Sequence, residues 1–185
     1  MRPRTLAAAG LVVLLAVAGC DRPTKTGAAP ATSTPGFSHG MNSDLSGYYM
    51  PLGEVRVGKW SLDHVFIGQI ADFRAWEAGT RAETFAPVML QFDDVTSPMV
   101  ATEIGEARSI TARVLPTAYS VTDAAIRFEG RSPELGVISF EGVLDPGALA
   151  TSRRNLGNEG VVVTGTLTIG NTPARNVQLR WWGGD

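Results

Sequence analysis

The feature that most constrains the fold is an alternation of apolar and polar residues in short runs near the C-terminus. Between residues 138 and 141, Ile138 and Phe140 alternate with Ser139 and Glu141. Successive side chains of a β-strand point to opposite faces, so this period of two predicts strands with one buried and one wetted face. The same pattern occurs at 161–169 and 175–182, and the Gly-Asn pair between these two runs predicts a hairpin turn.

Runs rich in Val, Ile, Phe, Trp and Thr, separated by Gly, Pro and Asp, fill the chain from residue 48 onward. Nine candidate strands lie at residues 54–57, 61–70, 73–77, 85–92, 109–115, 124–129, 136–144, 161–169 and 175–182. One short helix is predicted over residues 145–155, because Asp145 can cap it, Pro146 suits its first position and Gly157 can end it. We therefore expect an all-β domain, an antiparallel β-barrel or sandwich of about eight strands with one short helix. Barrel and sandwich need the same alternation, so both stay open.

The first twenty residues have the layout of a secretory signal. Arg2 and Arg4 form a positive region, and residues 6–18 form an apolar run that is too short to span a membrane. The sequence Val-Ala-Gly-Cys at 17–20 resembles the lipobox of bacterial lipoproteins. The resemblance implies that the chain is cleaved before Cys20, and that diacylglycerol is attached to the Cys20 thiol.

The sequence predicts three parts: a lipoprotein signal peptide at 1–19, the lipidated Cys20 with a flexible tether at 20–47, and a β-domain at 48–185. Small and polar residues with scattered Pro cannot bury enough apolar surface to offset the entropy of ordering the tether. We expect the protein in a bacterial cell envelope, facing the periplasm and held to the membrane by its lipid anchor. Asp21 weakly favours the inner membrane over the outer, and the choice stays open.

Three segments of the predicted β-domain resemble YceI-like proteins. The run Val-Thr-Gly-Thr-Leu-Thr-Ile at 163–169, followed by Asn-Thr and then Val-Gln-Leu at 177–179, is similar to the closing hairpin of that family. Phe-Glu-Gly at 140–142 and Ser-Leu-Asp-His at 61–64 lie earlier in the chain, in an order that is compatible with the family. The resemblance implies a lipocalin-like antiparallel barrel that encloses a long apolar ligand of the isoprenoid kind.

Aromatic side chains are the candidates for lining such a barrel, which at about eight strands is just wide enough for side chains or one small ligand. The candidate ligand-binding residues are Trp60, Phe66, Phe73, Trp76, Phe92, Phe128, Phe140 and Trp181. The alternative is that they form a solid core. The protein is then an envelope scaffold or interaction protein with a filled β-sandwich core, and its possible partner is another envelope protein.

Several chemistries find little support in the sequence. With a formal net charge of −2, no basic stripe marks a nucleic-acid partner. The single cysteine, Cys20, excludes an internal disulfide, and phosphate loops and dinucleotide fingerprints are absent. A G-x-S-x-G motif at 36–40 lacks the strand and helix that a nucleophile elbow needs. His64 beside Asp63 is more typical of a surface pair than of a base, and the acids around Pro98 suit a solvated turn. We expect no enzyme activity, no metal site and no cofactor.

Overall fold

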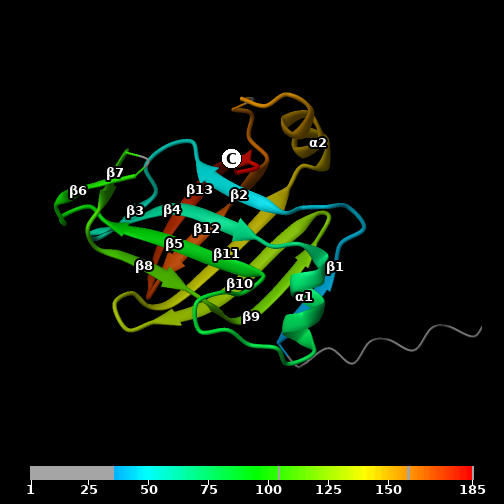
Figure 1. The fold of residues 1–185 in the computed structure, drawn as a ribbon, viewed down its shortest axis with the longest axis horizontal. Helices are drawn as coiled ribbons and strands as arrows, with labels where there is room; N and C mark the ends of the chain where they lie inside the picture. The colour runs from blue at the N-terminus through cyan, green and yellow to red at the C-terminus, as the bar shows by residue number, and fades with distance from the viewer. Residues whose placement is uncertain (1–35, 104, 158, 185) are drawn as a thin grey trace, which may run out of the picture. The chain divides into compact units, whose positions relative to one another are not determined.

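The computed structural model describes residues 36–103, 105–157 and 159–184 (Figure 1). The expected signal peptide, the lipidation site Cys20 and the tether up to residue 35 lie outside this part. Neither helix in the described part is long and apolar enough to cross a bilayer.

Strands dominate the described part of the chain, and two helices interrupt them. In chain order the elements are β1 (Phe37–Gly40), β2 (Gly47–Pro51), β3 (Arg56–Val57), β4 (Trp60–Ile67), α1 (Ile70–Glu77), β5 (Val88–Asp94), β6 (Met99–Thr102), β7 (Gly105–Arg108), β8 (Thr111–Val114), β9 (Pro116–Thr122), β10 (Ala125–Ser132), β11 (Gly136–Leu144), α2 (Pro146–Arg154), β12 (Val163–Ile169) and β13 (Thr172–Trp182). The prediction of an all-β domain is confirmed.

One curled sheet holds most of these strands, in the order β1-β9-β10-β11-β12-β13-β2-β4-β5-β8 (Figure 1). β3 adds to β4, and β6 pairs with β7 in a small separate hairpin. All pairs are antiparallel except β1 with β9, which is parallel. The expectation of a purely antiparallel sheet of about eight strands was therefore wrong: the sheet is mixed and has more strands.

The curl of the sheet depends on a bend at Leu115. β8 and β9 are separated only by this residue, yet β8 pairs with β5 and β9 pairs with β10. The predicted strand at 109–115 stopped at the bend, because Pro116 cannot donate a ladder hydrogen bond. A proline is nevertheless tolerated as the first residue of a strand, and the chain continues directly into β9.

The polar segment before residue 48 is folded from Gly36 onward, so the predicted boundary of the tether at residue 47 was too late. β1 pairs with β9, and the apolar side chains of Met41 and Leu45 are buried. The carboxylate of Asp123 accepts hydrogen bonds from the backbone N–H groups of Asn42 and Ser43. Two buried apolar side chains and a few backbone hydrogen bonds hold this segment in place. They could not be recognised from its composition, which is polar on average.

A second helix, α1, replaces the strand predicted at 73–77, so the expectation of one helix was also wrong. The carboxylate of Asp72 accepts a hydrogen bond from the backbone N–H of Gln69 at the start of the helix. Phe73 and Trp76 are its buried residues. Their spacing of three places both on one side of a helix, whereas in a strand they would point to opposite faces.

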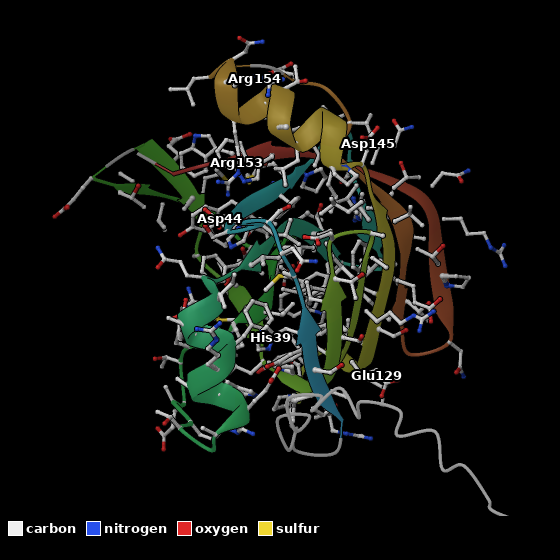
Figure 2. The ribbon with its side chains drawn as sticks, turned by 90° about the vertical axis from the view of Figure 1, so that its right-hand side faces the viewer. His39, Asp44, Glu129, Asp145, Arg153 and Arg154 are labelled. Atoms are coloured by element: carbon white, nitrogen blue, oxygen red, sulfur yellow. The ribbon has the colours of Figure 1, made fainter. Side chains whose placement is uncertain are left out.

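The helix predicted at 145–155 and the predicted hairpin are confirmed. α2 begins after Asp145, whose carboxylate accepts hydrogen bonds from the N–H groups of Gly147 and Ala148. Figure 2 shows α2 across one end of the strands, above Asp44. Arg153 of α2 donates to Asp44 and to the carbonyl of Ser46, which ties the helix to the segment before β2. β12 and β13 form the predicted hairpin, and Ile169 and Thr172 are the paired residues next to its turn.

Candidate binding face

Six of the eight predicted ligand-binding residues are buried in one hydrophobic cluster, and the other two, Phe66 and Trp181, are partly buried and pack against it. Phe92, Phe128 and Phe140 are buried on the inner face of the sheet, as is Trp60. Phe73 and Trp76 are the buried residues of α1. Trp181 is half-buried; its indole N–H donates to the carbonyl of Ser46, and the guanidinium of Arg153 lies over its ring. Phe66 points away from the interior.

The interior is filled closely enough that two strand positions have no room for a side chain. A Cβ atom on Gly130 would lie 2.7 Å from both Phe128 and Val114. A Cβ atom on Gly142 would lie 2.8 Å from Val163 and 2.9 Å from Phe140. Both glycines provide the space that the neighbouring rings occupy.

An outward-facing row of aromatic side chains crosses adjacent strands. Trp182 of β13 is paired with Tyr48 of β2, and Tyr48 is paired with Phe66 of β4. Phe85, just before β5, continues the row, which we define as Tyr48, Phe66, Phe85 and Trp182. The ring centroids are 5.4 Å apart for Tyr48 and Trp182, 5.3 Å for Tyr48 and Phe66, and 5.8 Å for Phe66 and Phe85.

Alternation explains why this aromatic row faces outward. The next residues along the strands, Tyr49, Val65 and Ile67, are fully buried, so the row lies on the opposite face. Trp182 is 40% exposed and Phe85 is 38% exposed. Tyr48 and Phe66 between them are half-buried. A contiguous, partly exposed apolar row of this kind is typical of binding surfaces.

Hydrogen-bonding side chains lie directly beside the aromatic row. A bulge in β4 opposite β5 falls between Leu62 and His64. It places both Asp63 and His64 on the outer face, because the buried side chains on either side are Leu62 and Val65. Nδ1 of His64 lies 2.7 Å from the Asp63 carboxylate, and its ring packs edge-on against Tyr48 at 5.0 Å.

β5 extends this polar strip with two more side chains. Gln91 is paired with His64, and Asp93 is paired with Ser61. Burial, and then the nearby Asp63 carboxylate, raise the pKa of Asp93 above its ordinary value, and the charges of Arg108 and His64 oppose that rise. The outer face therefore carries an aromatic row and, next to it, a strip of carboxylate, imidazole and amide groups.

A hollow of about 350 Å³ lies at the Trp182 end of the aromatic row. Its lining includes Ser152 of α2, Arg180, Trp181 and Trp182 of β13, and the backbone of Gly183 and Gly184. Ser152 is only 3% exposed, and its hydroxyl has no hydrogen-bond partner among the residues that the structure describes.

A second polar cluster joins β1, α1 and β9. Nδ1 of His39 lies 2.9 Å from the Glu77 carboxylate, and the hydroxyl of Tyr119 donates to the same oxygen at 3.1 Å. Burial and the Glu77 charge raise the pKa of Tyr119. Phe73 packs against both His39 and Tyr119. Figure 2 shows His39 on β1 beside the helix. This cluster is largely buried and fastens α1 to the sheet, which is a structural role.

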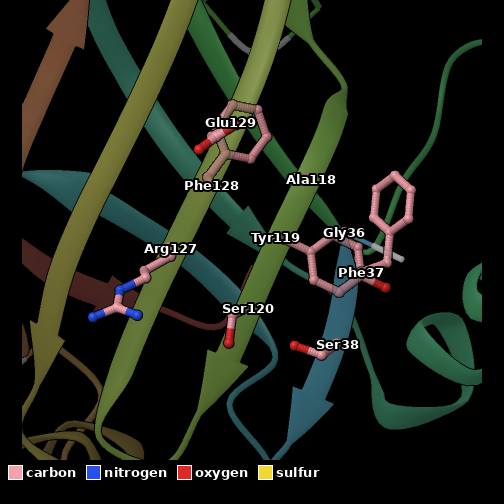
Figure 3. A pocket seen from close by; sticks show the side chains of 9 residues that line it. All are labelled: Gly36, Phe37, Ser38, Ala118, Tyr119, Ser120, Arg127, Phe128 and Glu129. Atoms are coloured by element: carbon pink, nitrogen blue, oxygen red, sulfur yellow. The ribbon is translucent and has the colours of Figure 1, made fainter. Parts of the chain in front are cut away.

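The G-x-S-x-G motif does not form a nucleophile elbow, because its residues lie in and next to strand β1 rather than at a strand-to-helix turn. Ser38 is exposed and paired with Ser120 of β9, which is paired with Arg127 of β10. These side chains border a surface hollow of about 410 Å³ (Figure 3). No base contacts Ser38 among the residues described, since the neighbouring His39 points to the other face of the strand and contacts Glu77.

Sequence reasoning missed part of the aromatic row. Phe66 was predicted to line an interior, and Tyr48 lay at the boundary of the expected tether. The signal that could have found the row is the presence of aromatic residues at outward positions of the alternation. The unpartnered hydroxyl of Ser152 has no sequence signal, because it depends on how α2 packs.

Comparisons with family models, with curated proteins and with solved structures each found no match for this chain.

Proposed function

We propose that this chain is a lipid-anchored protein of the bacterial cell envelope, and that its β-domain has a filled core and binds a partner through its outer face. The observation that carries the proposal is the combination of a close-packed interior with an exposed aromatic row. An interior occupied by its own side chains favours an interaction protein over a carrier that encloses its ligand.

The packing around Gly130 and Gly142 supports the filled core. Phe128 and Phe140 occupy the space above these glycines, and both rings are almost fully buried. Sheets of about eight strands that close on themselves have an interior just wide enough for side chains to fill. An apolar ligand would therefore have to displace rings that already pack at van der Waals distance.

The strand order is compatible with the barrel that the resemblance to YceI-like proteins implies. If the bent β8 and β9 count as one strand, the pairings form a closed circuit of β2, β4, β5, β8 with β9, β10, β11, β12 and β13. The parallel β1 then lies outside the circuit. A carrier of an isoprenoid-like ligand is the second candidate function, favoured by this topology and disfavoured by the filled interior.

Native mass spectrometry tests the proposal. The full chain, released from the membrane in a polyoxyethylene detergent and stripped of detergent in the gas phase, is expected to show its lipid-modified mass with no further adduct. A retained non-covalent adduct of an apolar small molecule would contradict the filled core and favour the carrier. The covalent lipid survives denaturation whereas a bound ligand does not, so a denatured sample of the same protein is the control.

A further inference from the structure

The hollow beside Trp182 contains a polar group that the fold does not use. Buried hydroxyls in proteins nearly always have a hydrogen-bond partner, and leaving one without a partner costs free energy. Ser152 is buried without a partner among the described residues and lines this hollow, together with Arg180, Trp181 and Trp182. The lining therefore combines hydrogen-bonding and aromatic residues, which suits one polar guest.

We propose that the hollow and the aromatic row together bind an extended β-linked glycan chain. One sugar occupies the hollow against Ser152, and the following sugars lie on Trp182, Tyr48 and Phe66. This inference rests on the proposed function and names its partner.

The chemistry of the face matches a sugar chain. A pyranose ring has apolar C–H faces, which pack on aromatic rings, and hydroxyl groups around its edge, which need hydrogen-bond partners. The rings of the aromatic row provide the first, and Asp63, His64 and Gln91 beside them provide the second. The rings repeat at about the spacing of adjacent strands, which is similar to the advance of one sugar in an extended β-linked chain.

Charge argues against a bilayer as the occupant. Surfaces that bind anionic membranes carry Lys and Arg around their apolar groups. Here the face carries both signs of charge: the carboxylates of Asp63 and Asp93 lie near Arg113, which donates to Gln91, and Arg180 lies on the same side of β13 as Trp182. The face therefore has no excess of positive charge for lipid phosphates, and its carboxylates are suitable acceptors for sugar hydroxyls.

Calorimetric titration of the full chain in a polyoxyethylene detergent, with the β-1,4-linked hexamer of N-acetylglucosamine as the probe, tests the proposal. We expect a saturable heat of binding. The same titration followed by fluorescence is expected to quench or shift the tryptophan emission. Trp182→Ala and Tyr48→Ala are each expected to raise the Kd roughly tenfold, as the loss of a stacked ring typically does. The matched control is Val143→Ala, which truncates a 69% exposed side chain on β11 and should leave the Kd unchanged.

Ser152→Ala separates binding from folding. Because the hydroxyl has no partner within the described fold, its removal should leave the urea midpoint unchanged or raised while it weakens glycan binding. Loss of stability together with loss of binding would assign Ser152 a purely structural role and overturn its part in the site.

Three results would overturn the glycan proposal as a whole. The first is the absence of saturable binding, and the second is equal binding by the wild type and all variants. The third is quenching of the wild-type tryptophan fluorescence by brominated lipids in nanodiscs that is lost in Trp182→Ala, which would assign the face to the bilayer. Native mass spectrometry tests the filled core, whereas the titration tests glycan binding. The failure of one proposal can therefore be distinguished from the failure of the other.

Discussion

At the scale of single residues, the packing of the interior depends on two glycines. Gly130 and Gly142 occupy buried positions of β10 and β11, where the rings of Phe128 and Phe140 lie across them. Because protein interiors are close-packed, adding or removing one methyl group at such a position disturbs the packing of the neighbouring side chains. The filled core can therefore be tested by adding one carbon atom.

We expect Gly130→Ala to lower the free energy of unfolding by about 1–3 kcal/mol, because the new Cβ atom would overlap Phe128 and Val114. Urea unfolding at neutral pH measures this. The matched control is Gly53→Ala, where nothing lies within 4 Å of the added atom, and its unfolding free energy should stay within about 0.5 kcal/mol of the wild type. Equal stability of both variants would show that the interior has free space.

Asp94 is a buried carboxylate whose partners make the fold sensitive to acid. Hydrogen bonds from Lys59 and from Thr96 lower the pKa of Asp94 to about 2. Its ordinary value of 3.8 applies to the unfolded chain. Because the folded-state pKa is the lower one, the stabilisation is fully present above pH 3.8 and is lost as the pH falls through about 2.

The expected result is that Asp94→Asn lowers the urea midpoint at pH 7 and flattens its decline between pH 4 and pH 2. Urea midpoints of both proteins across this range measure the effect. Glu141→Gln, which changes an exposed carboxyl group on β11, serves as the control and should keep the wild-type decline. Parallel declines in wild type and Asp94→Asn would mean that other acids set the acid sensitivity.

At the scale of elements, sequence patterns succeeded where the number of alternating residues was large. The strands around Ile138, Leu167 and Leu179 were predicted because each has several apolar residues on one face. β1 and β2 are only four and five residues long, so their pattern was too short to stand out. α1 was mistaken for a strand because a helix of only eight residues gives a short periodic signal, although the spacing of three between its two buried aromatics fits a helix.

The candidate site was less predictable than the fold. Alternation indicates which side chains of one strand point outward. It does not indicate which outward residues on different strands become neighbours, because that depends on the order and register of the strands. Tyr48 and Trp182 are far apart in the sequence and meet only because β2 pairs with β13.

β1 and the segment that follows it should be needed for stability, although their composition is that of a linker. A chain beginning at Gly36 keeps every element that the structure describes, whereas a chain beginning at Ser46 loses β1 and the buried Met41 and Leu45. We expect the shorter chain to be less stable by roughly 3 kcal/mol or more, from the two lost apolar side chains alone. Comparing the thermal unfolding of the two chains by circular dichroism checks this; equal midpoints would make β1 dispensable.

At the scale of the whole molecule, the proposed anchor and the aromatic row lie in separate parts of the chain. The proposed anchor depends on Cys20, whereas the row belongs to strands β2, β4 and β13 and to Phe85, which precedes β5. Anchoring and partner binding should therefore be separable by substitution.

In fractionated bacterial cells, Cys20→Ser is expected to move the protein out of the lipid-modified pool, and metabolic labelling with palmitate should be lost. Trp182→Ala should keep the label. Palmitate labelling of the Cys20→Ser variant would contradict the proposed anchor, and it would do so without bearing on the glycan site.

The parallel pairing of β1 with β9 has a mechanical consequence. In the proposed arrangement, a pull between the membrane anchor and a bound partner enters the domain at Gly36 and reaches β1 first. β1 joins the sheet through four paired residues along a single edge, whereas the strands of the aromatic row are bonded on both sides. Under load, β1 is the element that yields first. Its release would lengthen the link to the membrane while the strands that hold the partner stay in register.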